Sequence, residues 1–120
     1  RKVIDSSDFV LLHGNGVDAV GGIRRMVSGV RGIDSYKGQP IVFNEDDHFD
    51  FRSPNNNFRE ALECRASWGY FDPGDAANGG FAYGDYINGY QNPPVNWDIN
   101  TTRKKEFFDF VSNITGSANK

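Results

Sequence analysis

The chemically most capable residues of this 120-residue chain form one dense run, Asn44-Glu45-Asp46-Asp47-His48, directly after the apolar segment 40–43. Glu45 follows that segment and stands beside Asn44, which predicts a carboxylate held rigidly at the rim of a pocket. Such a carboxylate can attack the anomeric carbon of a sugar, stabilise an oxocarbenium ion or act as a base. Position alone leaves an alternative, in which the run is an acidic loop exposed to water.

The same run permits a metal site as a second alternative. Glu45, Asp46, Asp47 and Asp50 supply oxygen ligands of the kind that calcium prefers. The spacing lacks the glycine and the terminal glutamate of an EF-hand loop, so we expect no bound metal and no cofactor. We interpret His48 as a hydrogen-bonding residue that orients a carboxylate or a sugar hydroxyl.

Two other apolar segments also end in polar residues. Residues 8–13 end in His13 and are followed by Asn15, and residues 66–71 are followed by Asp72. We predict that these three polar side chains, together with Asn44, contact a substrate. Trp68, within the later segment, is interpreted either as a flat platform for a sugar ring or as a core aromatic.

The segments that position these residues alternate in pattern. Short apolar runs predict strands buried on both faces, and apolar residues at a spacing of three to four predict helices between them. The first helix would bury Val17, Val20, Ile23, Val27 and Val30, and a second would bury Phe58, Ala61 and Leu62. Repeated βα units imply parallel pairing. The carboxyl ends of parallel strands are where ligands bind in such proteins, which brings the polar residues together.

The last part of the chain is a long connection and a helix. Residues 73–100 are rich in Gly, Asn and Pro, with aromatic residues spread among them. An ordered connection of this length is usually a binding loop. A helix over 102–114 is predicted from the apolar positions Phe107, Phe110, Val111 and Ile114, from the capping run 100–102 and from the stop at Gly116.

Composition excludes several classes of protein. The formal charge is 13 − 16 = −3 and the longest basic run is 103–105, so we expect no nucleic-acid partner. Apolar runs of a few residues are far shorter than the roughly 20 residues of a membrane span, so no membrane partner is expected. The single cysteine, Cys64, precludes an intrachain disulfide, and we interpret it as a packing residue. We expect one domain over residues 1–120 and assign no compartment.

Three segments carry a resemblance to a known family: Asp8-Phe-Val-Leu-Leu-His-Gly-Asn15, Pro40-Ile-Val-Phe-Asn-Glu-Asp-Asp-His-Phe49 and Ala66-Ser-Trp-Gly-Tyr-Phe-Asp72. Together they resemble the last three strands of a (β/α)8-barrel glycoside hydrolase, in the large retaining clan that includes cellulases. The resemblance implies that Glu45, at the end of strand seven, is the nucleophile and that Trp68, at the end of strand eight, is the sugar platform. It also implies that residues 17–36, 56–64 and 102–114 are the sixth, seventh and eighth helices.

The resemblance implies a partial barrel. A complete barrel has about 250 residues, and the general acid/base of the clan lies on strand four, which this sequence does not contain. Asp72 is the one substitute on a neighbouring strand, and nothing in the sequence indicates the raised pKa that the role requires. We therefore expect three parallel βα units completed by self-association or by the missing half of the barrel. The expected function is recognition or retaining hydrolysis of a carbohydrate, with a non-catalytic carbohydrate-binding or structural fragment as the alternative.

Overall fold

A computed structural model describes residues 2–18, 20–48, 50–72, 98–99 and 101–116. The chain divides into two compact units, residues 1–70 and 71–120, which we describe separately. The first unit contains α1 (Lys2–Asp5), β1 (Val10–His13), α2 (Gly22–Arg31), β2 (Ile41–Asp46), α3 (Asn57–Glu63) and β3 (Ser67–Tyr70). The second contains α4 (Thr102–Thr115). Most of the long connection predicted over 73–100 lies outside the described residues.

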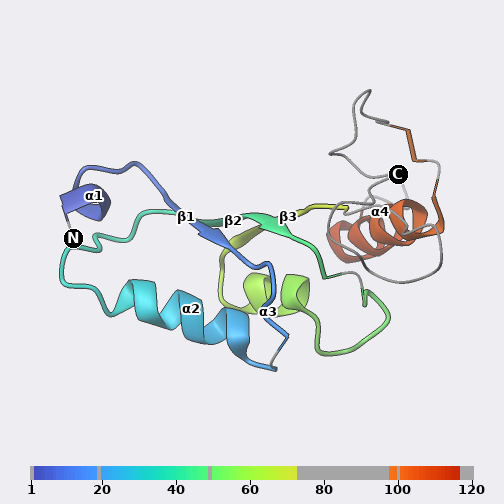
Figure 1. Cartoon of the computed structure of the whole chain (residues 1–120), viewed down its shortest axis with the longest axis horizontal. Coiled ribbons are helices and arrows are strands. Elements are labelled where there is room, and N and C mark those ends of the chain that lie inside the picture. Colours follow the sequence, from blue (N-terminus) through green and yellow to red (C-terminus); the bar gives the residue numbers. More distant parts are fainter. Residues whose placement is uncertain (1, 19, 49, 73–97, 100, 117–120) are drawn as a thin grey trace. The chain divides into compact units, whose positions relative to one another are not determined.

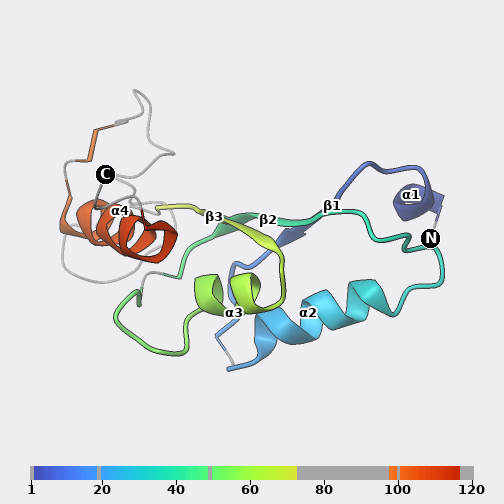
Figure 2. The same cartoon turned by 180° about the vertical axis from the view of Figure 1, so that it is seen from behind.

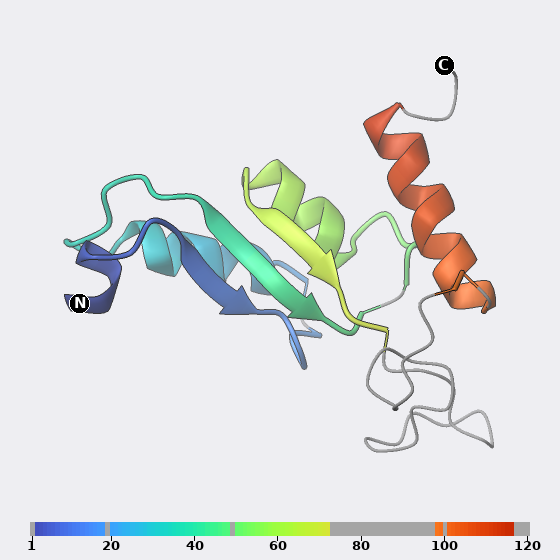
Figure 3. The same cartoon turned by 90° about the horizontal axis from the view of Figure 1, so that it is seen from above.

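The first unit is an α/β arrangement with one parallel sheet. Its three strands run in the order β1-β2-β3, and both pairings are parallel. Figure 3 shows the strands side by side and pointing the same way, and Figures 1 and 2 show α2 and α3 on the same face of the sheet. The predicted α/β arrangement with three parallel strands is therefore confirmed. Closure of the sheet into a barrel stays a prediction.

The core lies between the sheet and these two helices. Ile23, Val27 and Val30 form the buried stripe of α2, as the apolar spacing predicted. They pack in one cluster with Ile41 and Phe43 of the central strand. Cys64 is buried at the edge of this cluster, as expected of a packing residue. Burial of such side chains contributes about 25 cal/mol for each Å² of apolar surface removed from water.

Predictions of burial were wrong at four residues. Leu11 of β1 is 48% exposed and Phe9, just before β1, is 52% exposed, because within the first unit the described residues form no layer on the face of the sheet opposite α2 and α3 (Figure 1). Leu62 is 43% exposed, because the buried side of α3 is formed by Phe58 and Ala61. Val20 is 71% exposed, because it precedes the helix that was expected to contain it.

Helix α2 is also shorter than the predicted span 17–36. Gly21 adopts a left-handed conformation with φ 77°, and the helix begins at the next residue. The carboxylate of Glu60, from α3, accepts hydrogen bonds from the backbone N–H groups of Gly21 and Arg24. This carboxylate satisfies N–H groups that a helix N-terminus leaves free, and its charge complements the helix dipole. The residue that caps the start of α2 thus comes from a distant segment, and the local apolar spacing does not reveal it.

The second unit has its helix where it was predicted. The Thr101 side chain accepts a hydrogen bond from the backbone N–H of Lys104, and Gly116 ends the helix with φ 70°. Phe110 is buried, as its place on the apolar face predicted. In the described part of the chain, no helix has the length and apolarity needed to cross a membrane.

Candidate functional site at the carboxyl end of the sheet

Strand β2 carries a β-bulge just before its carboxyl end. On the β1 side, Phe43 pairs with Leu12 and Glu45 pairs with the next residue, His13. On the β3 side, Phe43 pairs with Trp68, and Asp46 pairs with Tyr70, only two residues further on. Residues three apart on a regular strand face opposite sides of the sheet, yet Phe43 and Asp46 are both fully buried. One extra residue in β2 explains this, because a bulge changes the direction in which the following side chain points.

The carboxylate of Asp46 is the centre of a hydrogen-bond network. Its Oδ1 accepts a hydrogen bond from the backbone N–H of His48 at 3.0 Å. Its Oδ2 accepts hydrogen bonds from Asn57 Nδ2 at 2.9 Å and from Trp68 Nε1 at 2.8 Å. Burial alone would raise the pKa of the Asp46 carboxyl, but the hydrogen bonds from His48, Trp68 and Asn57 outweigh burial and lower it. A single buried anion therefore ties β2 to α3 and β3.

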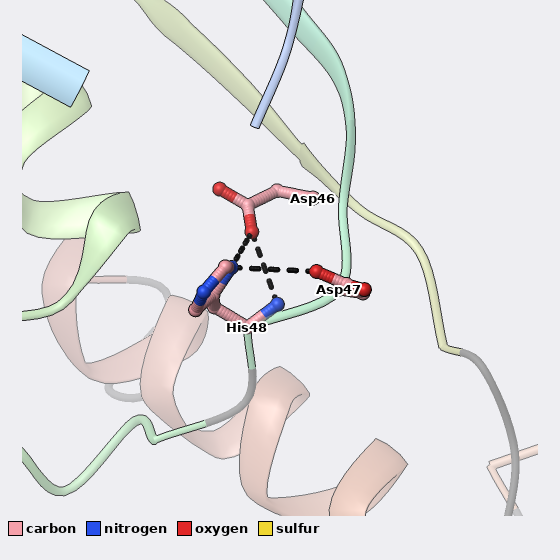
Figure 4. Close-up of side chains that lie close together, drawn as sticks. All are labelled: Asp46, Asp47 and His48. Atoms are coloured by element: carbon pink, nitrogen blue, oxygen red, sulfur yellow. Dashed lines mark hydrogen bonds and ion pairs between the residues drawn. The ribbon is translucent and has the colours of Figure 1, made fainter. Parts of the chain in front are cut away.

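His48 lies among carboxylates, two of which are shown with it in Figure 4. Its Nδ1 is 2.6 Å from Asp46 Oδ1 and 3.4 Å from Asp47 Oδ1, and its Nε2 is 2.7 Å from Asp18 Oδ1. The hydrogen bond to Asp46 raises the pKa of His48 to about 9, against burial, and the bond to Asp18 adds to the effect. At neutral pH His48 is therefore an imidazolium, whose charge offsets part of the negative charge of the acidic run.

Two glycines make room for this arrangement. A Cβ atom on Gly14 would collide with the Asp46 carboxylate, and a Cβ atom on Gly69 would lie 3.0 Å from the backbone oxygen of Asn44 in the bulge. Glycine inside a strand is a signal of a bulge or of a close backbone approach. Gly69, between Trp68 and Tyr70, carries that signal in the sequence, although apolar runs alone do not reveal it.

Glu45 is on the bulge and reaches solvent. Its Oε2 lies 3.3 Å from Nδ1 of His13, the residue with which it pairs across β1 and β2. The two side chains are 42% and 57% exposed, respectively. Asn44, the neighbouring bulge residue, is exposed as well. The structure therefore brings together the predicted nucleophile and two predicted substrate-binding residues.

Trp68 packs partly into the core. Its ring meets Phe58 edge-on, with centroids 5.3 Å apart, and lies nearly parallel to Tyr70, with centroids 6.0 Å apart. The side chain is half-buried, and its indole N–H points to Asp46. The interpretation of Trp68 as a core aromatic is thus confirmed for part of the ring, while sugar stacking stays a prediction.

The structure shows no contact of Glu45 with the two remaining candidates, Asn15 and Asp72, among the interactions of the described residues. Asn15 is half-buried in the turn after β1, and its Oδ1 is buried without a hydrogen-bond partner among the described residues. Asp72 belongs to the second unit, where it is buried, with Oδ1 3.4 Å from Nη1 of Arg103. The structure does not relate Asp72 to Glu45, because the two residues belong to different units.

The acidic run is geometrically compact enough to be tested as a metal site. Asp46, Asp47 and His48 each offer one ligand atom, and these atoms lie within 4.8 Å of one another. Both oxygens of Asp46 and both ring nitrogens of His48 already have partners within the protein. A cation would have to displace these partners, so the group is better described as an ion-pair network.

Comparison of the chain with protein-family models, with curated proteins and with solved structures gave no match.

Proposed function

We propose that this chain is the carboxyl-terminal part of a glycoside-hydrolase-like barrel, that it acts on or recognises a carbohydrate, and that Glu45 is the nucleophile. The observation that carries the proposal is the place of Glu45. It presents a half-exposed carboxylate at the carboxyl end of the central strand of a parallel sheet. That end of the strands is where ligands bind in parallel βα architectures. The presence of both helices on one face of the sheet also fits the wall of a barrel.

The chemistry assigned to Glu45 is nucleophilic substitution at the anomeric carbon of a sugar. A bond forms between a carboxylate oxygen and that carbon as the bond to the leaving oxygen breaks, and water then hydrolyses the glycosyl ester. His13 lies beside Glu45 on the neighbouring strand β1 and supplies a hydrogen-bonding group. Trp68, on the other neighbouring strand, is the aromatic surface that the proposal assigns to the sugar.

The leaving oxygen needs a proton from a general acid, a role that requires a raised pKa. Asp46 is the carboxyl group beside Glu45, and its pKa is lowered. Asp46 is therefore unsuited to the role, and we assign the general acid to strand four of the complete barrel, which this sequence does not contain.

A 2-deoxy-2-fluoroglycosyl fluoride tests the proposal without depending on that acid. Fluoride leaves without protonation, and the fluorine at C2 slows hydrolysis of the covalent intermediate, so the nucleophile stays labelled. The probes are the gluco, manno, galacto and xylo reagents, applied to this chain and to a longer protein that contains it. We expect mass spectrometry to find the label on the peptide that contains Glu45. A label on another carboxylate would overturn the assignment.

Glu45→Gln is the matched control, because it keeps the shape of the side chain and removes its charge. In the complete barrel it should lose several orders of magnitude in hydrolysis of an aryl glycoside. Its free energy of unfolding should stay within about 1 kcal/mol of wild type, since the side chain is away from the core. Sugar binding with no labelling and no hydrolysis would favour the alternative function, a non-catalytic carbohydrate-binding module.

A further inference from the structure

We propose that Asp46 is the positioning residue of this site: it anchors the bulge of β2 from the buried side and thereby fixes Glu45 at the exposed rim. The inference rests on the proposed function of Glu45 and deepens it. Asp46 itself is fully buried and is not expected to touch a substrate.

The first step of the argument is the register of the strand. Side chains alternate between the two faces of a strand, so a shift of one residue exchanges the buried and exposed sets. If the bulge at residues 44–45 were lost, Asp46 would move to the uncovered face and Glu45 would turn toward the helices. The exposure of Glu45 and the burial of Asp46 are therefore two results of the same extra residue.

The second step is the set of interactions that keeps Asp46 inside. Trp68 and Asn57 donate to one oxygen, and the backbone and ring of His48 contact the other. Hydrogen bonds to an ionised acceptor are about twice as strong as neutral ones. Loss of the bulge would break the hydrogen bonds from Trp68 and Asn57 and leave both donors without the charged acceptor.

The third step is that all three strand ends converge on this carboxylate. Gly14 follows β1 and leaves no space between its Cα and the Asp46 carboxylate for a side chain. Asn57 donates both to Asp46 and to the backbone oxygen of Val17, which lies in the connection between β1 and α2. Trp68 makes the link to β3. The anchor therefore holds Glu45 in register with the strands that carry His13 and Trp68.

A role in stability alone would make a different prediction from a positioning role. A residue that only stabilises the fold should alter the labelling of Glu45 no more than an equally destabilising change elsewhere. A positioning residue should alter the labelling at equal stability, because a displacement of about 1 Å at a reacting group costs about 100-fold in rate.

The experiment compares three variants, each made in the longer protein that contains this chain or, where that protein does not fold, in this chain alone. Asp46→Asn keeps the shape of the anchor but turns an amide N–H₂ toward hydrogen-bond donors. Gly69→Ala places a Cβ atom 3.0 Å from the bulge oxygen and leaves Asp46 intact. Val27→Ala is the control, because Val27 is fully buried in α2 and belongs to the same core. Labelling of Glu45 by the 2-deoxy-2-fluoroglycosyl fluoride is measured at temperatures where each variant has the near-ultraviolet circular dichroism of wild type.

We expect Asp46→Asn to label about 100-fold more slowly than wild type, Gly69→Ala to be slowed in the same direction, and Val27→Ala to label at nearly the wild-type rate. Interstrand nuclear Overhauser effects report the register independently of any sugar. We expect those for the pair His13 and Glu45 to change in the first two variants only.

The outcomes separate the two proposals. If wild type is not labelled but the register changes in Asp46→Asn and Gly69→Ala, the role of Glu45 as nucleophile fails and the anchor stands. If wild type is labelled, and both variants label as fast as Val27→Ala with an unchanged register, the positioning role of Asp46 is overturned. If Asp46→Asn does not fold, Gly69→Ala decides by the same two measurements.

Discussion

The indole N–H of Trp68 donates a hydrogen bond of 2.8 Å to the buried carboxylate of Asp46. The hydrogen bond thus joins an aromatic residue on β3 to an acidic residue at the end of β2. The bond fixes the rotation of the indole ring, because the ring packs on Phe58 while its N–H must reach Asp46. The orientation of the proposed sugar platform therefore depends on the same carboxylate that anchors the bulge.

Trp68→Phe should lower the free energy of unfolding by about 1–3 kcal/mol, because a buried charged acceptor loses a donor while most of the ring is kept. Trp68→Ala should lower it by about 3–5 kcal/mol, since the contacts with Phe58 and Tyr70 are lost as well. Urea denaturation of both variants measures these differences. Phe9→Ala, at a residue that is 52% exposed, is the control and should change little. A Trp68→Phe variant as stable as wild type would contradict the importance of the bond.

The ion pairs of His48 predict a specific dependence of stability on pH. The pKa of His48 is about 9 in the folded state and about 6.5 when unperturbed. A raised folded pKa means that the stabilisation is complete below the unperturbed value and is lost as the pH rises toward 9. With an allowance for partial exposure to solvent, we expect a loss of about 1–2 kcal/mol between these two pH values.

His48→Gln should remove this dependence, because glutamine has no titrating group. Chemical denaturation across the same pH range compares the two proteins. Nuclear magnetic resonance of the His48 ring protons gives the titration midpoint directly. A midpoint near the unperturbed value would show that the ion pairs do not form in solution.

A pair of glycine substitutions tests the close packing around Asp46. Gly14→Ala should strongly destabilise the protein, because the new methyl group would overlap the buried carboxylate. Gly29→Ala is the matched control: a Cβ atom there meets open space in the interior of α2. It should stabilise the protein by about 0.5–1 kcal/mol, since alanine favours the helix. Thermal unfolding should give a lower melting temperature for Gly14→Ala and a higher one for Gly29→Ala. Similar melting temperatures for the two variants would contradict the close packing of Gly14 on Asp46.

The three strands and helix α4 were predictable because their signals are local. Apolar runs marked the three strands, and apolar spacing together with Thr101 and Gly116 marked α4. The start of α2 was not predictable from spacing, because the carboxylate that caps it comes from Glu60, 39 residues beyond Gly21. A contact over that separation leaves no periodic pattern in the sequence.

In the candidate site, too, some features were predictable from local sequence signals and others were not. The placement of Glu45 and His13 at neighbouring strand ends followed from parallel pairing. The role of Asp46 did not follow, because alternation along β2 does not anticipate a bulge, and the composition of the run suggests only that Asp46 is one of several possible metal ligands. Only the bulge separates two adjacent carboxylates into a buried anchor and an exposed group.

The closed ion-pair network leads us to predict that calcium, magnesium and manganese do not bind at Asp46, Asp47 and His48. Isothermal titration calorimetry at neutral pH should give no heat of specific binding, because a cation would have to displace both the Trp68 N–H and the His48 imidazolium. Binding that is abolished in Asp46→Asn would instead support the metal-dependent alternative.

The free edge of β1 leads to the last prediction, self-association or pairing with the missing half of a barrel. Within the described residues β1 pairs on one side only, and alternate backbone groups, such as those of Leu11, face the open side. Phe9 and Leu11 are about half exposed there and line an open groove with Val30. An unpaired apolar edge is a template for another strand.

Sedimentation velocity should therefore show association of this chain at micromolar concentration. Leu11→Lys should shift the population toward monomer, because a charge on an edge strand opposes strand pairing. Leu62→Lys, at a similarly exposed leucine on α3, is the control and should associate like wild type. A well-folded wild-type monomer at these concentrations, or equal association of the two lysine variants, would show that the β1 edge does not recruit a second strand.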